Sequence, residues 1–161
     1  MSGQEKIRMG KGALGRIFVA RLAPGCDLLN SLKRVAETED IRAGVILSGA
    51  ASLSQATLRN VRLFPDNFPI EDRHRIYTPK KEPLELLSLS GNISRKDGEV
   101  LIHCHITISS GLEDGRAYGG HLIEGCVVFS TGEIVIGEIT GIEMKRITDP
   151  ETHAFELYIE P

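Results

Sequence analysis

Three of the five histidines lie close enough in the sequence to bind one metal ion. His103 and His105 flank Cys104, and His121 follows sixteen residues after His105. Residues two apart on a strand point to the same face, about 6–7 Å apart, so the first two imidazoles can reach one ion. A third imidazole from a neighbouring strand would complete a set of three nitrogens, which leaves a fourth position open on a tetrahedral zinc. The spacing therefore predicts a metal site with His103, His105 and His121 as its ligands.

A simpler interpretation is that the first two histidines belong to a solvated sheet face. The segment alternates with a period of two: one face is apolar (Val100, Ile102, Cys104, Ile106, Ile108) and the other is largely polar (Leu101, His103, His105, Thr107, Ser109). The pair Gly119-Gly120 before His121 favours the metal interpretation, because glycine inside a strand usually marks a bulge or a close approach of the backbone. Cys104 falls on the opposite face, which argues against a nucleophilic pair of cysteine and histidine.

Two acidic residues are candidates for a general base, or for a group that orients a ligand. Glu124 follows His121 by three residues, and Glu85 is expected on a neighbouring strand. Either could act on water bound to the metal, whose pKa the metal would lower. The alternative is that both are ordinary surface carboxylates.

Composition limits the classes of function. The chain has 161 residues, a net charge of −3 and a pI near 6.0, so strong non-specific binding of nucleic-acid phosphates is not expected. Three widely spaced cysteines, with no Cys-x-x-Cys, predict neither a disulfide framework nor a zinc ribbon. No apolar run approaches the ~20 residues that span a bilayer, and the first residues lack the apolar core of a leader. We expect a soluble, cytoplasmic protein.

Helical periodicity is clear in one segment. Asp27 is a suitable N-cap, and apolar residues then recur at helical spacing (Leu28, Leu29, Leu32, Val35, Ala36). Residues 15–22 before it and residues 44–48 after it have the pattern of strands, so the order suggests a crossover connection. The small residues 49–52 that follow favour tight packing over ligand contact.

The rest of the chain predicts strands at 55–64, 84–93, 99–109, 119–129, 133–139 and 155–159. Asp97-Gly98 supplies a tight hairpin turn. Residues 65–83, with four prolines, are expected to form a surface loop. Residues 133–139 alternate enough in apolarity to aggregate if they form an uncovered sheet edge. Neither a Walker loop nor a dinucleotide-binding turn is present.

Several of these segments resemble one known family. Residues 46–50, 57–59, 84–93, 103–105 and 119–125 are similar, in order and spacing, to the plants-and-prokaryotes conserved (PPC) domain, over about residues 16–159. The resemblance implies an α+β fold with a mostly antiparallel sheet and one main amphipathic helix, assembled as a homotrimer with sites near the subunit boundaries. The expected organisation is an N-terminal extension (1–14) and a single PPC-like domain (15–161).

The family includes plant members and stand-alone prokaryotic members, and the two kinds imply different functions for this chain. Plant members carry AT-hooks that bind A·T-rich DNA, and their PPC domain serves trimerisation and partner contacts. An AT-hook needs an Arg-Gly-Arg-Pro core, which neither residues 6–8 nor residues 11–13 supply. The chain therefore resembles the stand-alone prokaryotic type, in which histidines corresponding to His103, His105 and His121 look like a metal site. Three imidazoles suit zinc best, and other divalent metals are possible.

Two classes of function follow from the sequence. The first is a homotrimeric metal-binding module, either a metalloenzyme of undefined reaction or a protein that senses a small-molecule ligand. The second is a non-enzymatic assembly or regulatory module that acts with DNA-binding partners, in which the histidines only stiffen a subunit contact. A bound metal with an open coordination position favours the first class.

Overall fold

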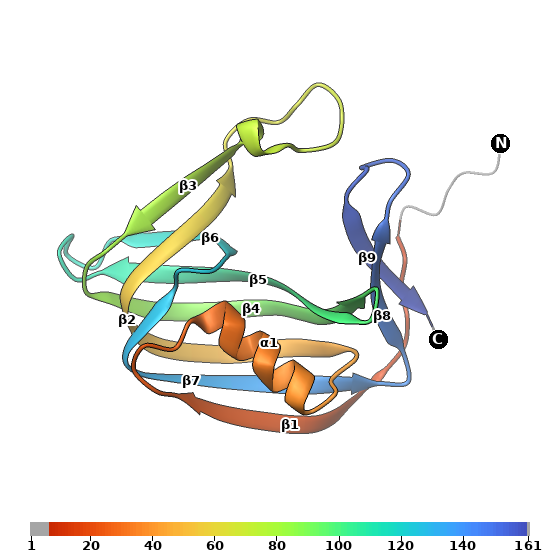
Figure 1. The fold of residues 1–161 in the computed structure, drawn as a ribbon, viewed down its shortest axis with the longest axis horizontal. Helices are drawn as coiled ribbons and strands as arrows, with labels where there is room; N and C mark the ends of the chain where they lie inside the picture. Colours follow the sequence, from red (N-terminus) through yellow and green to blue (C-terminus); the bar gives the residue numbers. More distant parts are fainter. Residues whose placement is uncertain (1–6, 161) are drawn as a thin grey trace.

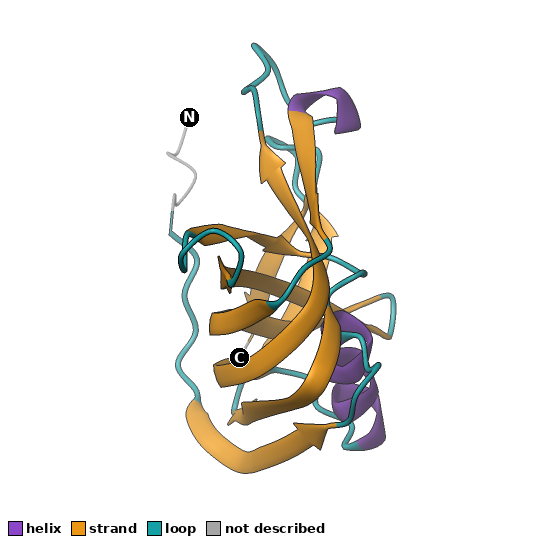
Figure 2. Cartoon of the chain, turned by 90° about the vertical axis from the view of Figure 1, so that its left-hand side faces the viewer, coloured by secondary structure: helices purple, strands orange, loops and turns teal. Residues whose placement is uncertain are grey.

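A computed structural model describes residues 7–160, which form one strongly curved sheet with a single α-helix against one side (Figures 1 and 2). This confirms the predicted fold class. The elements are β1 (Ala13–Leu22), α1 (Leu28–Thr38), β2 (Gly44–Val61), a 3₁₀ turn (Asp72–His74), β3 (Arg75–Lys80), β4 (Leu84–Lys96), β5 (Glu99–Ser110), β6 (Ala117–Leu122), β7 (Val127–Thr140), β8 (Glu143–Thr148) and β9 (Phe155–Glu160).

The predicted crossover is present between β1 and β2. Both strands pair antiparallel with β7, so they run parallel to each other with β7 between them. Asp27 caps α1 by accepting a hydrogen bond from the Asn30 N–H at 3.0 Å, and it also accepts one from the Gly125 N–H at 2.8 Å. The helix buries Leu28, Leu32 and Ala36 against the sheet, where the apolar residues of β5 complete the core.

Strand β2 is the centre of the sheet and has two sets of neighbours. Its first half pairs with β7 on one side and β4 on the other, whereas its second half pairs with β3 and β6. The two predicted strands 44–48 and 55–64 are therefore one continuous strand. The small residues between them do pack tightly, because a Cβ on Gly49 would lie 2.9 Å from Leu89 Cδ2. Register shifts in the pairing with β7 let the strand bend here.

The structure differs from the sequence prediction at three other places in the chain. The predicted loop 65–83 contains the 3₁₀ turn and β3, and the predicted strand 119–129 is divided between β6 and β7 at Gly125, whose φ is +101°. Strand β8 was not predicted at all. The Asp97-Gly98 turn is confirmed: both residues have positive φ, at 53° and 88°, as a tight hairpin turn between β4 and β5 requires.

Residues 133–139 are not a sheet edge. They lie in β7, between β1 and β2, so the edge on this side is β1. Residues of β1 and of the start of β2 together form an apolar surface that we call the apolar edge face. It consists of Leu14, Ile17, Val19, Val45 and Leu47. Four of these side chains are strongly exposed; Val19, for example, is 77% exposed. The risk of aggregation that was predicted for residues 133–139 therefore applies to β1 instead.

Two hairpins rise from the sheet and stand apart from each other, one formed by β2 and β3 and the other by β8 and β9 (Figure 1). Within residues 7–160, no helix is long and apolar enough to cross a membrane.

Candidate metal centre

Strand register brings the three histidines together on the sheet face opposite the core. His105 lies directly across from His121 of β6, and His103 follows two residues earlier on β5. The residues between and beside them on β5, Ile102, Cys104 and Ile106, are buried in the core, so strict alternation turns His103 and His105 outward. Gly120 allows β6 to lie close to β2, since a Cβ on Gly120 would lie 2.9 Å from the side-chain Nδ2 of Asn60 and 3.2 Å from the Arg59 carbonyl oxygen.

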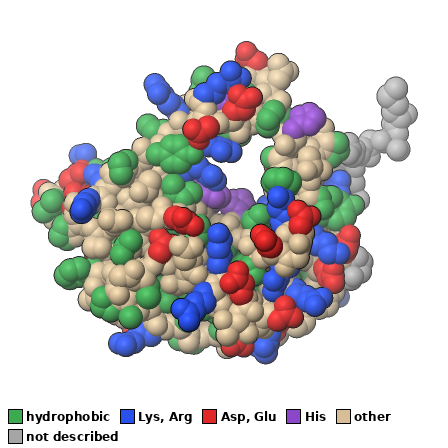
Figure 3. Space-filling view, in the orientation of Figure 1, with side chains coloured by type: hydrophobic (Ala, Val, Ile, Leu, Met, Phe, Trp, Pro, Cys, Tyr) green, Lys and Arg blue, Asp and Glu red, His purple; other side chains and the backbone are tan. Residues whose placement is uncertain are grey.

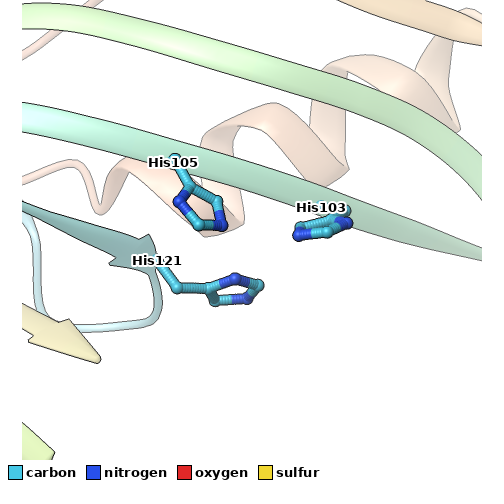
Figure 4. Close-up of side chains that lie close together, drawn as sticks. All are labelled: His103, His105 and His121. Carbon is cyan, nitrogen blue, oxygen red and sulfur yellow. The ribbon is translucent and has the colours of Figure 1, made fainter. Parts of the chain in front are cut away.

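The three imidazoles converge on one point (Figure 4). Their ring centroids are 5.1, 5.2 and 5.5 Å apart, and each ring offers a nitrogen within 4.8 Å of the other two. Nitrogens bound to one tetrahedral zinc at about 2.0–2.1 Å would be roughly 3.3 Å apart. Side-chain rotations that move each nitrogen by about 1 Å would therefore complete the site, with no change in the backbone.

The surroundings keep two of these imidazoles neutral, which is the form that binds metals. Burial, followed by the positive charge of Arg59 and the neighbouring histidines, lowers the pKa of His121 to about 3. Burial and the Arg146 guanidinium lower the pKa of His103 below its ordinary value. Metal binding here would not have to displace a proton from either side chain at neutral pH.

A buried guanidinium supports His103 from behind. Arg146 of β8 is only 6% exposed and donates hydrogen bonds to the Asn92 side-chain oxygen at 2.9 Å and to the Ser94 hydroxyl at 3.2 Å. Its remaining contact is with His103 Nδ1 at 3.3 Å. Because a guanidinium only donates, Nδ1 accepts in this contact and its lone pair is in use. A metal bound through His103 Nδ1 would take the place of this contact.

The histidines form part of the floor of a cleft of about 690 Å³ between the two raised hairpins. The space-filling view shows the hollow, with histidine at its base (Figure 3). One wall comes from β2, β3 and the segment around Phe68, and the other from the turn between β8 and β9, around Phe155. The cleft leaves room for a ligand beside any metal held at its floor.

The two acids singled out in the sequence do not line this cleft. Glu85 pairs with Ser109, four residues along β5 from His105, which is a separation of about 13 Å. Glu124 is exposed in the connection between β6 and β7. The carboxylate in the cleft is instead Glu156 of β9, whose charge acts on both His103 and Arg146. No local pattern marked Glu156, because its position depends on how the last hairpin folds back.

Cys104 is buried on the opposite face, as its place in the alternation predicted. It is 1% exposed, and burial raises the pKa of its thiol to about 12. Cys26, Cys104 and Cys126 are all free.

The family model of the Plants and Prokaryotes Conserved (PCC) domain, which is the PPC domain, matches residues 9–140. The chain belongs to this family. Strands β8 and β9, and with them Arg146 and Glu156, lie beyond the matched residues. Among curated relatives, the chain is 37% identical over 158 residues to a protein of Synechococcus named bifunctional protein GlmU, which covers 98% of this chain. The match spans only 22% of that relative, so the chain corresponds to about a fifth of its length.

Several solved structures resemble this chain over most of its length. A protein of Pyrococcus horikoshii described as a PPC protein is 31% identical, with a TM-score of 0.76, over 96% of this chain and 99% of that one. A protein of Archaeoglobus fulgidus described as metal-containing is 29% identical, with a TM-score of 0.77, over 94% and 99%. A protein of Ralstonia eutropha described as a putative DNA-binding protein is 26% identical, with a TM-score of 0.68, over 87% and 89%.

Proposed function

We propose that the protein binds a divalent metal ion, best satisfied by zinc, through His103, His105 and His121, and uses it as a small metalloenzyme or as a sensor of a small-molecule ligand. The observation that carries this proposal is the convergence of three imidazoles at the floor of a cleft, within 4.8 Å of one another. A related protein of known structure is described as metal-containing, which supports the same conclusion.

The donor set and the cleft together favour a site that acts on a ligand over a structural one. Three protein nitrogens leave one position of a tetrahedral ion free, whereas structural zinc sites fill all four positions with protein ligands. When bound, such an ion lowers the pKa of a coordinated water or polarises a carbonyl. This chain's residues hold the three nitrogens on rigid strands, and the cleft provides the access that a ligand requires.

We further propose that the chain assembles as a homotrimer through the apolar edge face. A row of directly paired residues on one face of the sheet runs from Ile17 through Gly137, Val45 and Asn92 to His103. The apolar edge face and the metal centre therefore share one surface of the sheet. Packing copies of the chain on this surface would cover the exposed side chains of β1 and would bring a neighbouring subunit toward the site.

Metal content of protein purified without chelators tests the proposed site. Wild-type protein should retain about one zinc per chain after dialysis, and His105→Ala should lose most of it because a directly bound nitrogen is removed. The half-exposed sheet face at this position should tolerate the change, so the thermal unfolding of the two metal-free proteins should be similar.

His153→Asn is the matched control. His153 also lines the cleft, in the turn between β8 and β9, but it lies outside the three-histidine group. Its φ of 54° favours asparagine over alanine as a replacement. Equal zinc content in wild-type protein and His105→Ala, or equal losses in His105→Ala and His153→Asn, would contradict the ligand assignment.

A second function is favoured by the apolar edge face and by the DNA-binding description of the Ralstonia relative. In this alternative, the assembled chain is a regulatory platform for DNA-binding partners, and the histidines do not hold an active metal. Purified protein that contains no metal, or a metal closed by four protein ligands, would favour the platform.

A further inference from the structure

Three arginines reach the cleft from three different strands. Arg59 of β2 pairs directly with His121, Arg75 of β3 lies diagonally across from Arg59, and Arg146 of β8 lies against His103. All three line the cleft that contains the histidines. Diagonal neighbours on an antiparallel pair are about 7–8 Å apart, so Arg59 and Arg75 can contact one small group between them.

Among residues 7–160, the ion pairs involve other basic side chains and none of these three arginines. Arg75 donates to the Ile70 carbonyl at 3.2 Å, and Arg146 uses neutral oxygens of Asn92 and Ser94. Burial, followed by the nearby Arg75 charge, lowers the pKa of Arg59 below its ordinary value, and Tyr77 and the Asp72 carboxylate offset this only in part. Like charges gathered with few carboxylates near them are costly, and such arrangements concentrate at functional sites.

Of the described residues that line the cleft, Glu156 is the one acid. Its Oε1 accepts a hydrogen bond from the Thr152 hydroxyl at 3.2 Å, and its charge reaches Arg146 and His103. One carboxylate does not balance three guanidinium groups, and a divalent metal at the histidines would add further positive charge. The cleft is therefore positive, although the whole chain carries a net charge of −3.

We propose that the cleft binds a small molecule with an oxyanion group, a carboxylate or a phosphate, held between Arg59 and Arg75 beside the metal ion. The inference rests on the proposed metal site and names the class of ligand that this site takes. Guanidinium groups bind both oxyanions through paired N–H donors. One oxygen of the ligand can then occupy the open position of the metal.

The rest of the ligand would lie between two aromatic side chains. Phe68 and Phe155 stand on opposite walls of the cleft and are 50% and 51% exposed. Their exposed rings favour a ligand whose anionic head is attached to an apolar body. Free inorganic phosphate should therefore bind more weakly than an aryl phosphate of the same charge.

Calorimetric titration at low ionic strength tests this inference with three probes: inorganic phosphate, phenyl phosphate and benzoate. Each is added to zinc-loaded and to chelator-treated protein that contains residues 1–161. Arg59→Gln and Arg75→Gln should each lower the affinity for the tighter-binding of the two aryl probes by about tenfold or more, because each removes a charged hydrogen-bond donor. Comparison of phenyl phosphate with benzoate distinguishes the two oxyanions.

Arg34→Gln is the matched control, since it removes the same charge from an exposed position on α1. It should change the affinity less than twofold. Failure of all probes to bind at millimolar concentration, or equal affinities in the three variants and wild type, would overturn the oxyanion site. Zinc content is measured on every sample: wild-type protein that takes up no zinc, yet binds the aryl probe through Arg59 and Arg75, would contradict the metal proposal and support the arginine site.

Discussion

At the scale of single residues, burial and nearby cations hold two of the three imidazoles in the neutral form. The pKa of His121 is lowered to about 3, so this imidazole stays neutral well into acidic solution, and burial also lowers the pKa of His103 below its ordinary value. The pH dependence of zinc binding should therefore differ from that of three unperturbed histidines, for which affinity would begin to fall together near pH 6.5.

We predict a shallow fall in zinc affinity below pH 6.5. Each ligand that gains a proton contributes a limiting loss of about tenfold per pH unit. Because His121 takes up its proton only near pH 3, the loss between pH 6.5 and 5.5 should not exceed about a hundredfold. Competition with a coloured zinc chelator at several pH values measures this slope. A loss clearly above a hundredfold between pH 6.5 and 5.5 would show that all three imidazoles titrate together.

The same pKa shifts determine whether acid stabilises or destabilises the metal-free protein. The unfolded chain gains protons at these histidines below about pH 6.5, while the folded chain holds His121 neutral until pH nears 3. Acid therefore favours the unfolded state across this window. Loss of metal and loss of stability should reinforce each other as the pH falls.

The convergence of the three histidines could be predicted from the sequence, whereas their surroundings could not. His103 and His105 share a short alternating segment, and His121 follows after one turn, so their convergence depends on local pattern alone. Arg146 contacts His103 across 43 positions of sequence. Such a contact depends on how β8 lies against β4, and nothing in the residues around Arg146 indicates it.

At the scale of elements, the pairing of β4 with β5 holds His103 and His105 in place. Gly91 of β4 lies opposite Cys104, between the two histidines, and a Cβ there would lie 2.1 Å from the His103 carbonyl oxygen and 2.6 Å from Cys104 Cα. Both contacts are with backbone, which cannot move without shifting β5. Glycine is therefore required at this position.

Gly91→Ala should destabilise the protein by about 1–3 kcal/mol, the usual range for overpacking, and should also weaken zinc binding because the ligands move with β5. Urea unfolding of metal-free protein and zinc titration measure the two effects. Gly119→Ala is the control: it lies in β6 with ordinary contacts of 3.4 Å or more, and it should leave both quantities nearly unchanged. If the two variants had similar stability and similar zinc affinity, the inference that backbone contacts require glycine at position 91 would be wrong.

Helices and turns could be predicted where the residues of one segment determine the structure. Strands could not be predicted where their extent depends on pairing with another strand. The helix cap at Asp27 and the Asp97-Gly98 turn are local and were predicted. The continuity of β2 was not, because Gly49 and its small neighbours resemble a break until Leu89 packs against them. Strand β3 was hidden among prolines and charges, and it exists because the second half of β2 provides a partner.

At the scale of the whole molecule, the apolar edge face predicts assembly. Wild-type protein should sediment with a mass near three times that of the 17.6 kDa chain. Val19→Lys places a charge in the middle of the face and should reduce the mass toward that of one chain. Leu112→Lys, at a position that is 71% exposed in the connection after β5, should not. A wild-type mass near 17.6 kDa at micromolar concentration would rule out the trimer.

The distribution of charge predicts weak binding to DNA. The net charge of −3 opposes non-specific attraction to phosphates, and the three arginines of the cleft lie at its walls and floor instead of on a flat surface. Fluorescence anisotropy with an A·T-rich duplex at physiological salt should show binding no tighter than micromolar. Sub-micromolar, sequence-selective binding by the chain alone would favour the regulatory function.

The row from Ile17 to His103 has a thermodynamic consequence. A subunit packed on the apolar edge face would restrain β1, β7, β2 and β4 in register, and Asn92 at the end of this row holds the guanidinium that contacts His103. If assembly favours the metal-binding arrangement of His103, linkage requires that metal favours assembly by the same factor. Zinc affinity would then rise with protein concentration, and dilution would release metal and separate subunits together.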